Sequence, residues 1–479
     1  MAKQKTNRPD TVKRPPELGA LKGVLRLIMS LRSINGTYNV TQGTILPGFM
    51  GSPHLFGMDK TWTAPGWGFI LGQQDPGLPQ KMADRGLLTH SNILTTPFSQ
   101  TQQKDLSLRT SLEPTPDIKI QLDLKKTSTT TFQEIFREDS TGQGKYLALS
   151  PSRSGSYRIS ALTIATAFKN NGSINSTVFN QFNQNITIVK DRFNTINSNY
   201  GEYQTQSQDV LIPAFIAAYS GKSANSVSLT PFPNIPIPNW RIDFTGLNKI
   251  PALQEIFQSI TLNHAYSSTY SVTNYTYSLD YSQLNIVGID KPVENYNHSQ
   301  FAQRKNIDNG QPIPVYVISN VMFSEQFSPL IGINMRTKSK LNVRFEYKMK
   351  REISLTVSNA QVTELNNKEW TMEIGYTKNN MKLPFKDKGR VITLKNDFTF
   401  RMTMSVGNNR IIQRKIDDVS TITSGAINFQ LRPNVNYVVN QKLNIQLYVD
   451  RTVNDPLVTN SYRRSTTQVG VKLLFNLAQ

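Results

Sequence analysis

The sequence contains no cysteine, so disulfide bonds, cysteine-based zinc sites and thiol catalysis are all excluded. Histidine is scarce, and its occurrences are scattered without the spacing that metal ligands on one helix face would show. They are His54, His90, His264 and His298. No Ser-His-Asp arrangement and no pair of carboxylates stands out either. We therefore expect a protein that is not an enzyme, with no catalytic residue, cofactor or bound metal.

Long hydrophobic runs are also lacking. The longest, Val210 to Tyr219, has about half of the roughly 20 residues that a membrane-spanning helix needs, and Pro213 interrupts it. The first residues are polar and contain Pro9, Pro15 and Pro16, so they do not form the apolar centre of a signal peptide. Two interpretations follow: the protein is cytoplasmic, or a signal peptide lies upstream of this chain.

Acidic residues are few relative to basic ones, with 33 Asp and Glu against 53 Lys and Arg and a net charge of +20. The stretches 1–26 and 379–415 are especially basic, and we expect residues 1–20 to form a basic, flexible segment. Such a balance is typical of proteins that bind nucleic acid, anionic lipid or an acidic partner, and it also arises when part of a larger protein is taken alone. Nucleic-acid-binding proteins gather cations and stacking aromatics on one face. Here the aromatics alternate with the cations, so no nucleic-acid partner is predicted.

What the sequence has in abundance is alternation of apolar and polar residues, the pattern of strands whose two faces differ. It is clearest in 341–349, and it recurs in 118–124, 370–376, 398–406 and 443–450. Turn-forming residues such as Asn379-Asn380 and Gly407-Asn408-Asn409 separate the runs. We therefore predict an all-β fold, with a meander of antiparallel strands from about residue 315 onward.

Two stretches rich in Gly, Pro and Trp, near 45–100 and 225–255, interrupt this pattern and predict long non-strand inserts. Their indoles are costly to leave in water, so we expect Trp62, Trp67 and Trp240 to be buried where the inserts fold against the strands. Within 251–260, Pro251 suits the first turn of a short helix.

The polar sides of the strands admit two interpretations. In an extracellular β-sandwich that binds glycans or surfaces, they form the outer surface. In a transmembrane barrel they face a water-filled lumen, while the apolar sides face lipid. Aromatic and long aliphatic residues on the apolar sides favour the barrel, with Leu341, Val343, Phe345 and Tyr347 toward lipid. The candidate lumen-facing residues are Arg344, Glu346, Lys348 and Arg401.

The last alternating run resembles the insertion signal of outer-membrane barrels, a final strand with an aromatic residue near its end. The candidate barrel-insertion strand contains Gly470, Leu473, Phe475 and Leu477. The usual signal ends on the aromatic residue itself, whereas here four residues follow Phe475. An ordinary terminal strand is the alternative.

Several segments together resemble SprA, also called Sov, the outer-membrane translocon of the type IX secretion system of Bacteroidota. The resemblance runs from about Leu25 to Leu477 and is carried by stretches such as 64–69, 208–215, 264–270 and 358–364. The family-like residues of the inserts are Pro47, Gly48, Gly66, Trp67, Gly68, Pro238, Asn239 and Trp240.

This resemblance implies an all-β fold that forms part of a very large antiparallel transmembrane β-barrel with long non-strand inserts; single-chain barrels reach about 36 strands. It implies passage of folded client proteins across the outer membrane and out through an opening in the wall. The implied partners are secreted clients, outer-membrane lipid, a lipid-facing shuttle barrel, and periplasmic plug or ring components. The implied location is the cell outer membrane, with a signal peptide upstream of this chain.

Members of this family are several times longer than this chain, which resembles their C-terminal portion. Residues 21–479 offer about 12 to 16 alternating runs, too few for such a barrel. Such a chain must leave an open edge, curl into a smaller closed barrel or pair with another chain. The family's wide barrel implies gently curved strands, so we expect an open, curved sheet. A terminal strand that pairs with a strand near residues 22–40 would contradict this expectation.

Overall fold

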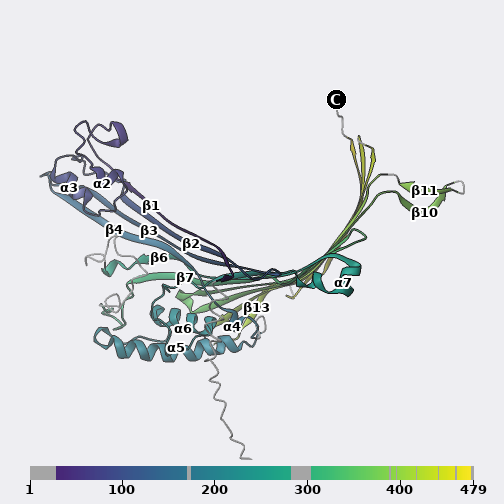
Figure 1. The fold of residues 1–479 in the computed structure, drawn as a ribbon. Helices are drawn as coiled ribbons and strands as arrows, with labels where there is room; N and C mark the ends of the chain where they lie inside the picture. The colour runs from purple at the N-terminus through teal and green to yellow at the C-terminus, as the bar shows by residue number, and fades with distance from the viewer. Residues whose placement is uncertain are drawn as a thin grey trace, which may run out of the picture.

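The computed structural model describes residues 29–169, 174–281, 304–387, 390–394, 396–416, 418–440, 442–458 and 461–475. The basic segment 1–20 and Leu477 lie outside these residues. One sheet of 13 antiparallel strands dominates the fold, and a two-stranded hairpin, β10–β11, stands apart from it (Figure 1). The all-β prediction is therefore confirmed at the level of the dominant antiparallel sheet.

The strands of the large sheet follow the chain closely. Their order is β1-β2-β3-β4-β6-β7-β8-β9-β12-β13-β14-β15, and short β5 pairs with both β3 and β6. The first seven are β1 (Leu31–Ile45), β2 (Phe98–Thr115), β3 (Ile118–Glu138), β4 (Tyr146–Ser160), β5 (Asn239–Phe244), β6 (Phe257–Tyr277) and β7 (Tyr316–Thr337). The others are β8 (Leu341–Thr356), β9 (Gln361–Lys378), β12 (Phe398–Lys415), β13 (Thr421–Asn440), β14 (Leu443–Pro456) and β15 (Arg464–Phe475). The hairpin consists of β10 (Met381–Asp387) and β11 (Arg390–Leu394).

The predicted meander from residue 315 onward is confirmed, because β7, β8, β9, β12, β13, β14 and β15 are successive neighbours in the sheet. The turn predicted at Gly407-Asn408-Asn409 is wrong. These residues lie inside β12, where they pair with both β9 and β13. The strands are thus longer than the alternating runs that predicted them.

The sheet is strongly curved, and its two ends do not meet (Figure 1). Within the described residues, β15 pairs with β14 alone and β1 pairs with β2 alone. The expected open, curved sheet is therefore what the described part of the chain forms.

A helical layer, α4 (Ile164–Ala167), α5 (Thr177–Ile196) and α6 (Gln208–Ser220), covers part of the convex face of the sheet (Figure 1). Ser176 caps α5 by accepting a hydrogen bond from the backbone N–H of Phe179 at 3.2 Å. The α6 residues Val210–Tyr219 are buried on all sides, and Gly221, with φ 72°, ends the helix in the left-handed conformation. The run that was too short to span a membrane is thus a buried core helix.

The main hydrophobic core lies between this helical layer and the sheet. Phe182 and Phe215 from the helices meet Phe323 and Tyr270 from the strands, and all four side chains are buried. Phe215 stacks on Phe323 with their ring centroids 5.6 Å apart. None of the helices in the part of the chain that the structure describes is both long and apolar enough to cross a membrane.

Residues 45–100 fold against the ends of β2, β3 and β4 and contain two short helices, α2 (Trp67–Ile70) and α3 (Leu78–Asp84). Leu78 and Met82 of α3 form a second core with Phe98 and Phe132 of the strands. The predicted burial of two indoles is wrong. Trp62 and Trp67 are 43% and 51% exposed and stack on each other, with ring centroids 5.7 Å apart.

Between residues 225 and 255 the chain is not wholly irregular, because Asn239–Phe244 forms β5 within the sheet. The predicted short helix is present as α7 (Pro251–Ile256), with proline in its first turn. Trp240 of β5 is partly buried and stacks on Tyr266, with ring centroids 4.4 Å apart. Among the described residues, the remaining short elements are 3₁₀ turns at Leu55–Gly57, Ser198–Tyr200, Gly246–Lys249, Leu279–Tyr281 and Val357–Asn359.

Candidate functional site: a sheet with one apolar and one polar face

Continuous strand register sorts the side chains of β8, β9 and β12 onto two different faces. Directly paired residues share a face, because side chains alternate along each strand with period two. Phe345 pairs with Met372, and Met372 pairs with Met404, so these three form one apolar row across the sheet. Their neighbours Thr371 and Ser405 form a polar row on the opposite face.

The apolar rows continue across seven neighbouring strands, and we call the resulting surface the apolar belt. It comprises Ile331, Ile333 and Met335 of β7; Leu341, Val343, Phe345 and Tyr347 of β8; Trp370, Met372, Ile374 and Tyr376 of β9; Phe398, Phe400, Met402, Met404 and Val406 of β12; Phe429, Leu431, Val435 and Tyr437 of β13; Ile445, Leu447 and Val449 of β14; and Val469, Val471, Leu473 and Phe475 of β15. None of these side chains is buried. The apolar belt is therefore a surface and not part of the core.

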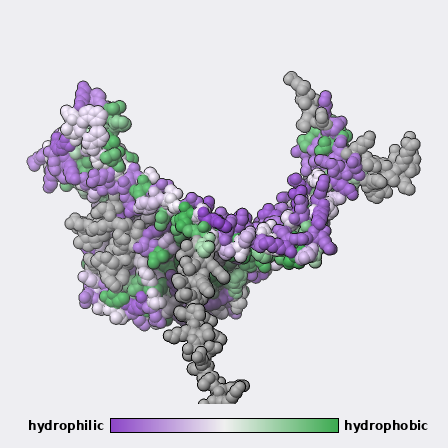
Figure 2. All heavy atoms as spheres, viewed as in Figure 1, coloured by the Kyte–Doolittle hydropathy of each residue, from purple (hydrophilic) through white to green (hydrophobic). Residues whose placement is uncertain are grey.

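The apolar belt lies on the convex side of the sheet. Farther along β8, the same face carries Ile353 and Leu355, which are buried in the core shared with the helical layer. On the right arm of the curve, which the later strands form, hydrophilic residues cover the inner side and hydrophobic residues are visible along the outer side (Figure 2). On β12 and β13 the belt is nine residues long, which is roughly 30 Å along a strand and roughly 23 Å at a tilt of about 40°.

The four candidate lumen-facing residues all lie on the concave side, which we call the polar face. Glu346 accepts from Arg344 Nη2 at 2.6 Å and from Lys348 Nζ at 3.0 Å, so a central carboxylate joins two cations along β8. Arg401 lies two strands away, where it pairs with Gly375 of β9. Arg344 and Arg401 also line the same shallow cavity of about 400 Å³, together with Glu373.

The candidate insertion strand contributes to both faces. Leu473 and Phe475 belong to the apolar belt and are 52% and 66% exposed. Gly470 lies on the polar face opposite Tyr448, and a Cβ added there would come within 2.5 Å of the Tyr448 hydroxyl oxygen. Glycine is therefore needed for this tyrosine ring to lie across β15.

The family-like insert residues form two separate groups. One group lies at the end of β2–β4: Pro47, Gly48, Gly66, Trp67 and Gly68. Gly48 and Gly66 have φ values of 73° and 115°, which glycine adopts readily. The other group, Pro238, Asn239 and Trp240, enters β5, where Asn239 Oδ1 accepts from the Ser268 backbone N–H at 2.8 Å. The structure does not bring the two groups together.

Sequence reasoning missed two buried ion pairs that join the sheet to the helical layer. Arg351 Nη2 and Glu325 Oε2 are 2.8 Å apart, and Arg351 Nη1 donates to the Thr166 carbonyl of α4 at 3.1 Å. Arg414 Nη2 and Glu364 Oε2 are 3.0 Å apart.

The second pair also holds α6, because the Tyr219 hydroxyl donates to Glu364 Oε1 at 3.0 Å. Burial and the neighbouring carboxylate raise the pKa of Tyr219, so its hydroxyl keeps its proton. A signal for both pairs was present in the sequence, since Glu325, Arg351 and Glu364 interrupt alternation at positions where the strand pattern calls for apolar residues.

Neither a family profile nor a curated protein matches this chain. Among the described residues, no three His, Asp or Glu side chains gather closely enough to hold a metal ion.

Proposed function

We propose that this chain forms part of the wall of an outer-membrane channel that passes folded client proteins to the cell surface in type IX secretion. The observation that carries the proposal is the apolar belt, which faces outward over seven strands while charged residues occupy the opposite face. A soluble protein rarely exposes an apolar patch larger than about 300–600 Å². Lipid is the environment that such a belt requires, and water is the environment that Arg344, Glu346, Lys348 and Arg401 require.

The dimensions of the belt support the same conclusion. A height of roughly 23 Å is close to the outward-facing apolar band of about 25 Å that outer-membrane barrels present. Aromatic residues border it on one side, where Tyr347 stacks on Trp370 with ring centroids 4.0 Å apart. Aromatic rings of this kind are enriched where a membrane meets water.

The other candidate, an extracellular β-sandwich that binds glycans or surfaces, finds less support. A sandwich buries the apolar face of one sheet against a second sheet about 10 Å away. Within the described residues the apolar face meets the helical layer and the loops that pack beside it, and the second sheet is the β10–β11 hairpin. The belt would then be left in water.

The proposed partners follow from the proposed channel. They are secreted client proteins on the polar face, outer-membrane lipid on the apolar belt, and the shuttle barrel and periplasmic plug or ring components of the secretion system. We propose no enzymatic step and no nucleic-acid partner for this chain.

Single cysteines provide a direct test, because the chain has none of its own. Adjacent residues of β9 and β12 form matched pairs, so we compare Met372→Cys with Thr371→Cys and Met404→Cys with Ser405→Cys. In intact membranes, a water-soluble maleimide should label the Thr371 and Ser405 variants only. All four should react in detergent. Equal labelling of Met372→Cys and Thr371→Cys in membranes would contradict a lipid-facing belt.

Cell fractionation and a secretion assay test the remaining parts of the proposal. The chain should stay in the outer-membrane fraction after a high-salt wash, since salt releases a peripheral basic protein but not an embedded one. Cells that lack the chain should retain folded clients in the periplasm, and complementation should restore their release. Normal secretion in such cells would refute the channel role even if the chain is embedded.

A further inference from the structure

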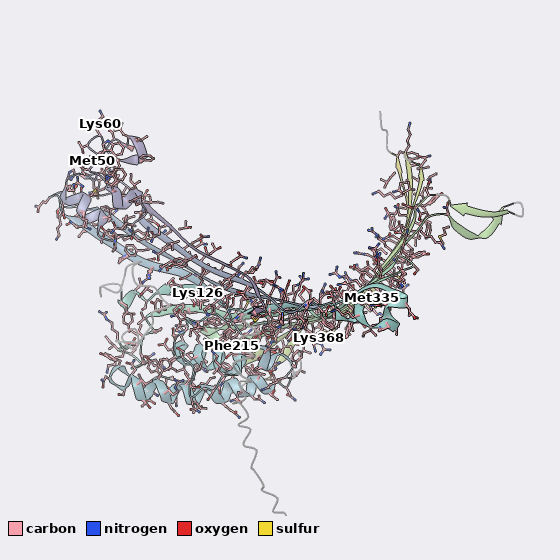
Figure 3. All side chains as sticks on the ribbon, in the orientation of Figure 1. Met50, Lys60, Lys126, Phe215, Met335 and Lys368 are labelled. Carbon is pink, nitrogen blue, oxygen red and sulfur yellow. The ribbon has the colours of Figure 1, made fainter. Side chains whose placement is uncertain are left out.

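A cavity of about 540 Å³ lies on the convex face where the apolar belt meets the helical layer. Strand register places three successive rows across β8, β9 and β12 at this point. The first row, Tyr347, Trp370 and Val406, is the edge of the belt. The second is Met349, Lys368 and Asn408, and the third is Arg351, Asn366 and Arg410. The surface thus changes from apolar through aromatic to cationic within about 14 Å; Figure 3 labels Lys368 in this central region of the sheet.

The cationic side of the cavity contains hydrogen-bond donors that lack acceptors. Arg351 and Asn366 are 4% and 7% exposed, and both line the cavity. Arg351 Nε and Asn366 Nδ2 have no acceptor among the described protein atoms. A buried N–H without an acceptor is destabilising, so its presence at a cavity indicates a ligand that supplies oxygen atoms.

The charge at the cavity favours an anion. Arg351, Lys368 and Arg410 face it, and Glu325 is the acid that lies with them. Glu325 is already paired with Arg351 at 2.8 Å. Lys368 is exposed and forms no ion pair with a described acid. The next acid on the same face of β9, Glu364, is paired with Arg414. A net positive charge therefore remains at the opening.

The opposite side of the cavity is apolar and opens toward the belt. Phe327, Leu330 and Met349 line it, and Phe168 packs on Phe327 with ring centroids 5.4 Å apart. Phe168 is 60% exposed although it lies at the end of α4 against the sheet. A ligand that fits both sides must combine an anionic group with hydrocarbon.

We propose that this cavity binds the phosphate-bearing headgroup of a membrane lipid, with the acyl chains lying along the apolar belt. Lys368, Arg410 and the Asn366 amide contact the phosphate oxygens, and Tyr347 and Trp370 pack beside the glycerol or sugar portion of the headgroup. The inference rests on the proposed function, because the chains reach the ligand only if the belt lies in a bilayer. It adds a fixed lipid to the wall and ties the helical layer to the membrane surface.

The test is native mass spectrometry of the full chain released from detergent micelles, with three probes. Phosphatidic acid supplies phosphate and acyl chains, diacylglycerol of the same chain length supplies only the chains, and inorganic phosphate supplies only the anion. We expect saturable binding of phosphatidic acid, at least tenfold tighter than either of the other two. Phosphate binding as tight as that of phosphatidic acid would instead indicate an anion site and overturn the lipid proposal.

A double variant assigns the site. Lys368→Ala/Arg410→Ala should weaken phosphatidic acid binding at least tenfold, and Asn366→Asp should weaken it by replacing a donor with a like charge. The control, Lys378→Ala/Arg401→Ala, also removes two exposed cations, one at the far edge of the belt and one on the polar face. Equal losses in the two double variants would overturn the site, since they would reflect net charge alone.

Flotation of the wild-type chain with neutral phosphatidylcholine vesicles tests the proposed membrane role independently of the lipid site. A chain that floats but shows no preference for phosphatidic acid refutes the lipid site and leaves the membrane role intact. A chain that fails to float but prefers phosphatidic acid in micelles refutes the membrane role.

Discussion

Replacing Arg414 by methionine should loosen the helical layer from the sheet. Arg414 and Glu364 are 0% and 1% exposed, and their side chains meet at 3.0 Å. Arg414 Nη1 also donates to the Ile174 carbonyl at 2.6 Å, just before α5 begins. Methionine fills much of the same volume but leaves the Glu364 carboxylate buried with Tyr219 as its remaining hydrogen-bond donor.

Removing one partner of a buried ion pair costs about 3–5 kcal/mol, because an uncompensated charge is left behind. Hydrogen exchange of the α6 amides, followed by mass spectrometry on the chain in micelles, measures how often this layer opens. That cost corresponds to exchange about 10²–10⁴ times faster in Arg414→Met than in the wild type. The double variant Arg414→Met/Glu364→Gln should recover most of the protection, since no charge remains buried and the amide still accepts from Tyr219.

The matched control is Arg432→Met, which breaks the ion pair between Arg432 and Asp450 on the polar face at 2.8 Å. Its side chains are 53% and 28% exposed, so the expected cost is at most about 1 kcal/mol and exchange in α6 should not change. If Arg414→Met and Arg432→Met leave α6 equally protected, the buried pair does not hold the helical layer and this reasoning is wrong.

Three further predictions concern other parts of the fold. Phe345→Arg should cost about 2–4 kcal/mol in folding into bilayers if Phe345 lies near the midplane, while Glu373→Arg on the polar face should cost under about 1 kcal/mol; equal costs would contradict the sidedness. Gly470→Val should destabilise the chain by about 1–3 kcal/mol in urea unfolding, and Tyr448→Ala should relieve most of that loss by removing the clash. Burial raises the pKa of Glu134 in β3 from 4.5 to about 7, so the folded state binds this proton more tightly than the unfolded state. The contribution of Glu134 to stability should therefore be greatest below about pH 4.5 and fall as pH rises toward 7, by on the order of 1–2 kcal/mol after allowance for hydration. The thermal midpoint, followed by tryptophan fluorescence, should lack this pH-dependent contribution in Glu134→Gln.

Much of the sheet could be predicted from the sequence because alternation is a local signal. The runs at 341–349 and 398–406 gave the correct element type and the correct sorting of side chains onto two faces. Their lengths were underestimated where polar residues continue a strand beyond the belt. Gly407 and Asn408 predict a turn when the sequence is considered locally. In the structure they pair with both β9 and β13, and this pairing overrides their local preference for a turn.

The helical layer could not be found by the same reasoning. The apolar residues of α5 recur with a helical period, but the helix has more polar than apolar residues, so it resembles a polar loop. α6 is apolar on nearly every side, so its sequence resembles that of a buried strand. The cavity between the apolar belt and the helical layer is lined by residues far apart in the chain, from Phe168 to Arg410. Each buried ion pair could be suspected from a charged residue at an apolar position of a strand, because such a charge needs a partner. The sequence does not identify which residue that partner is.

The strands are longer than a membrane is thick, so unpaired backbone groups along an open edge would be costly in lipid over only part of each strand. A strand tilted in a bilayer needs about 9–11 residues to cross, whereas β7 runs from Tyr316 to Thr337. At the β15 edge, the belt residues span 469–475, and the preceding residues, 464–468, lie beyond the belt. If the belt lies in a bilayer as proposed, water can satisfy the backbone groups of residues 464–468 but not those of residues 469–475. A segment of about seven residues, set at the height of the belt, would therefore suffice to seal this edge, and the remainder of the edge tolerates a loose fit or none.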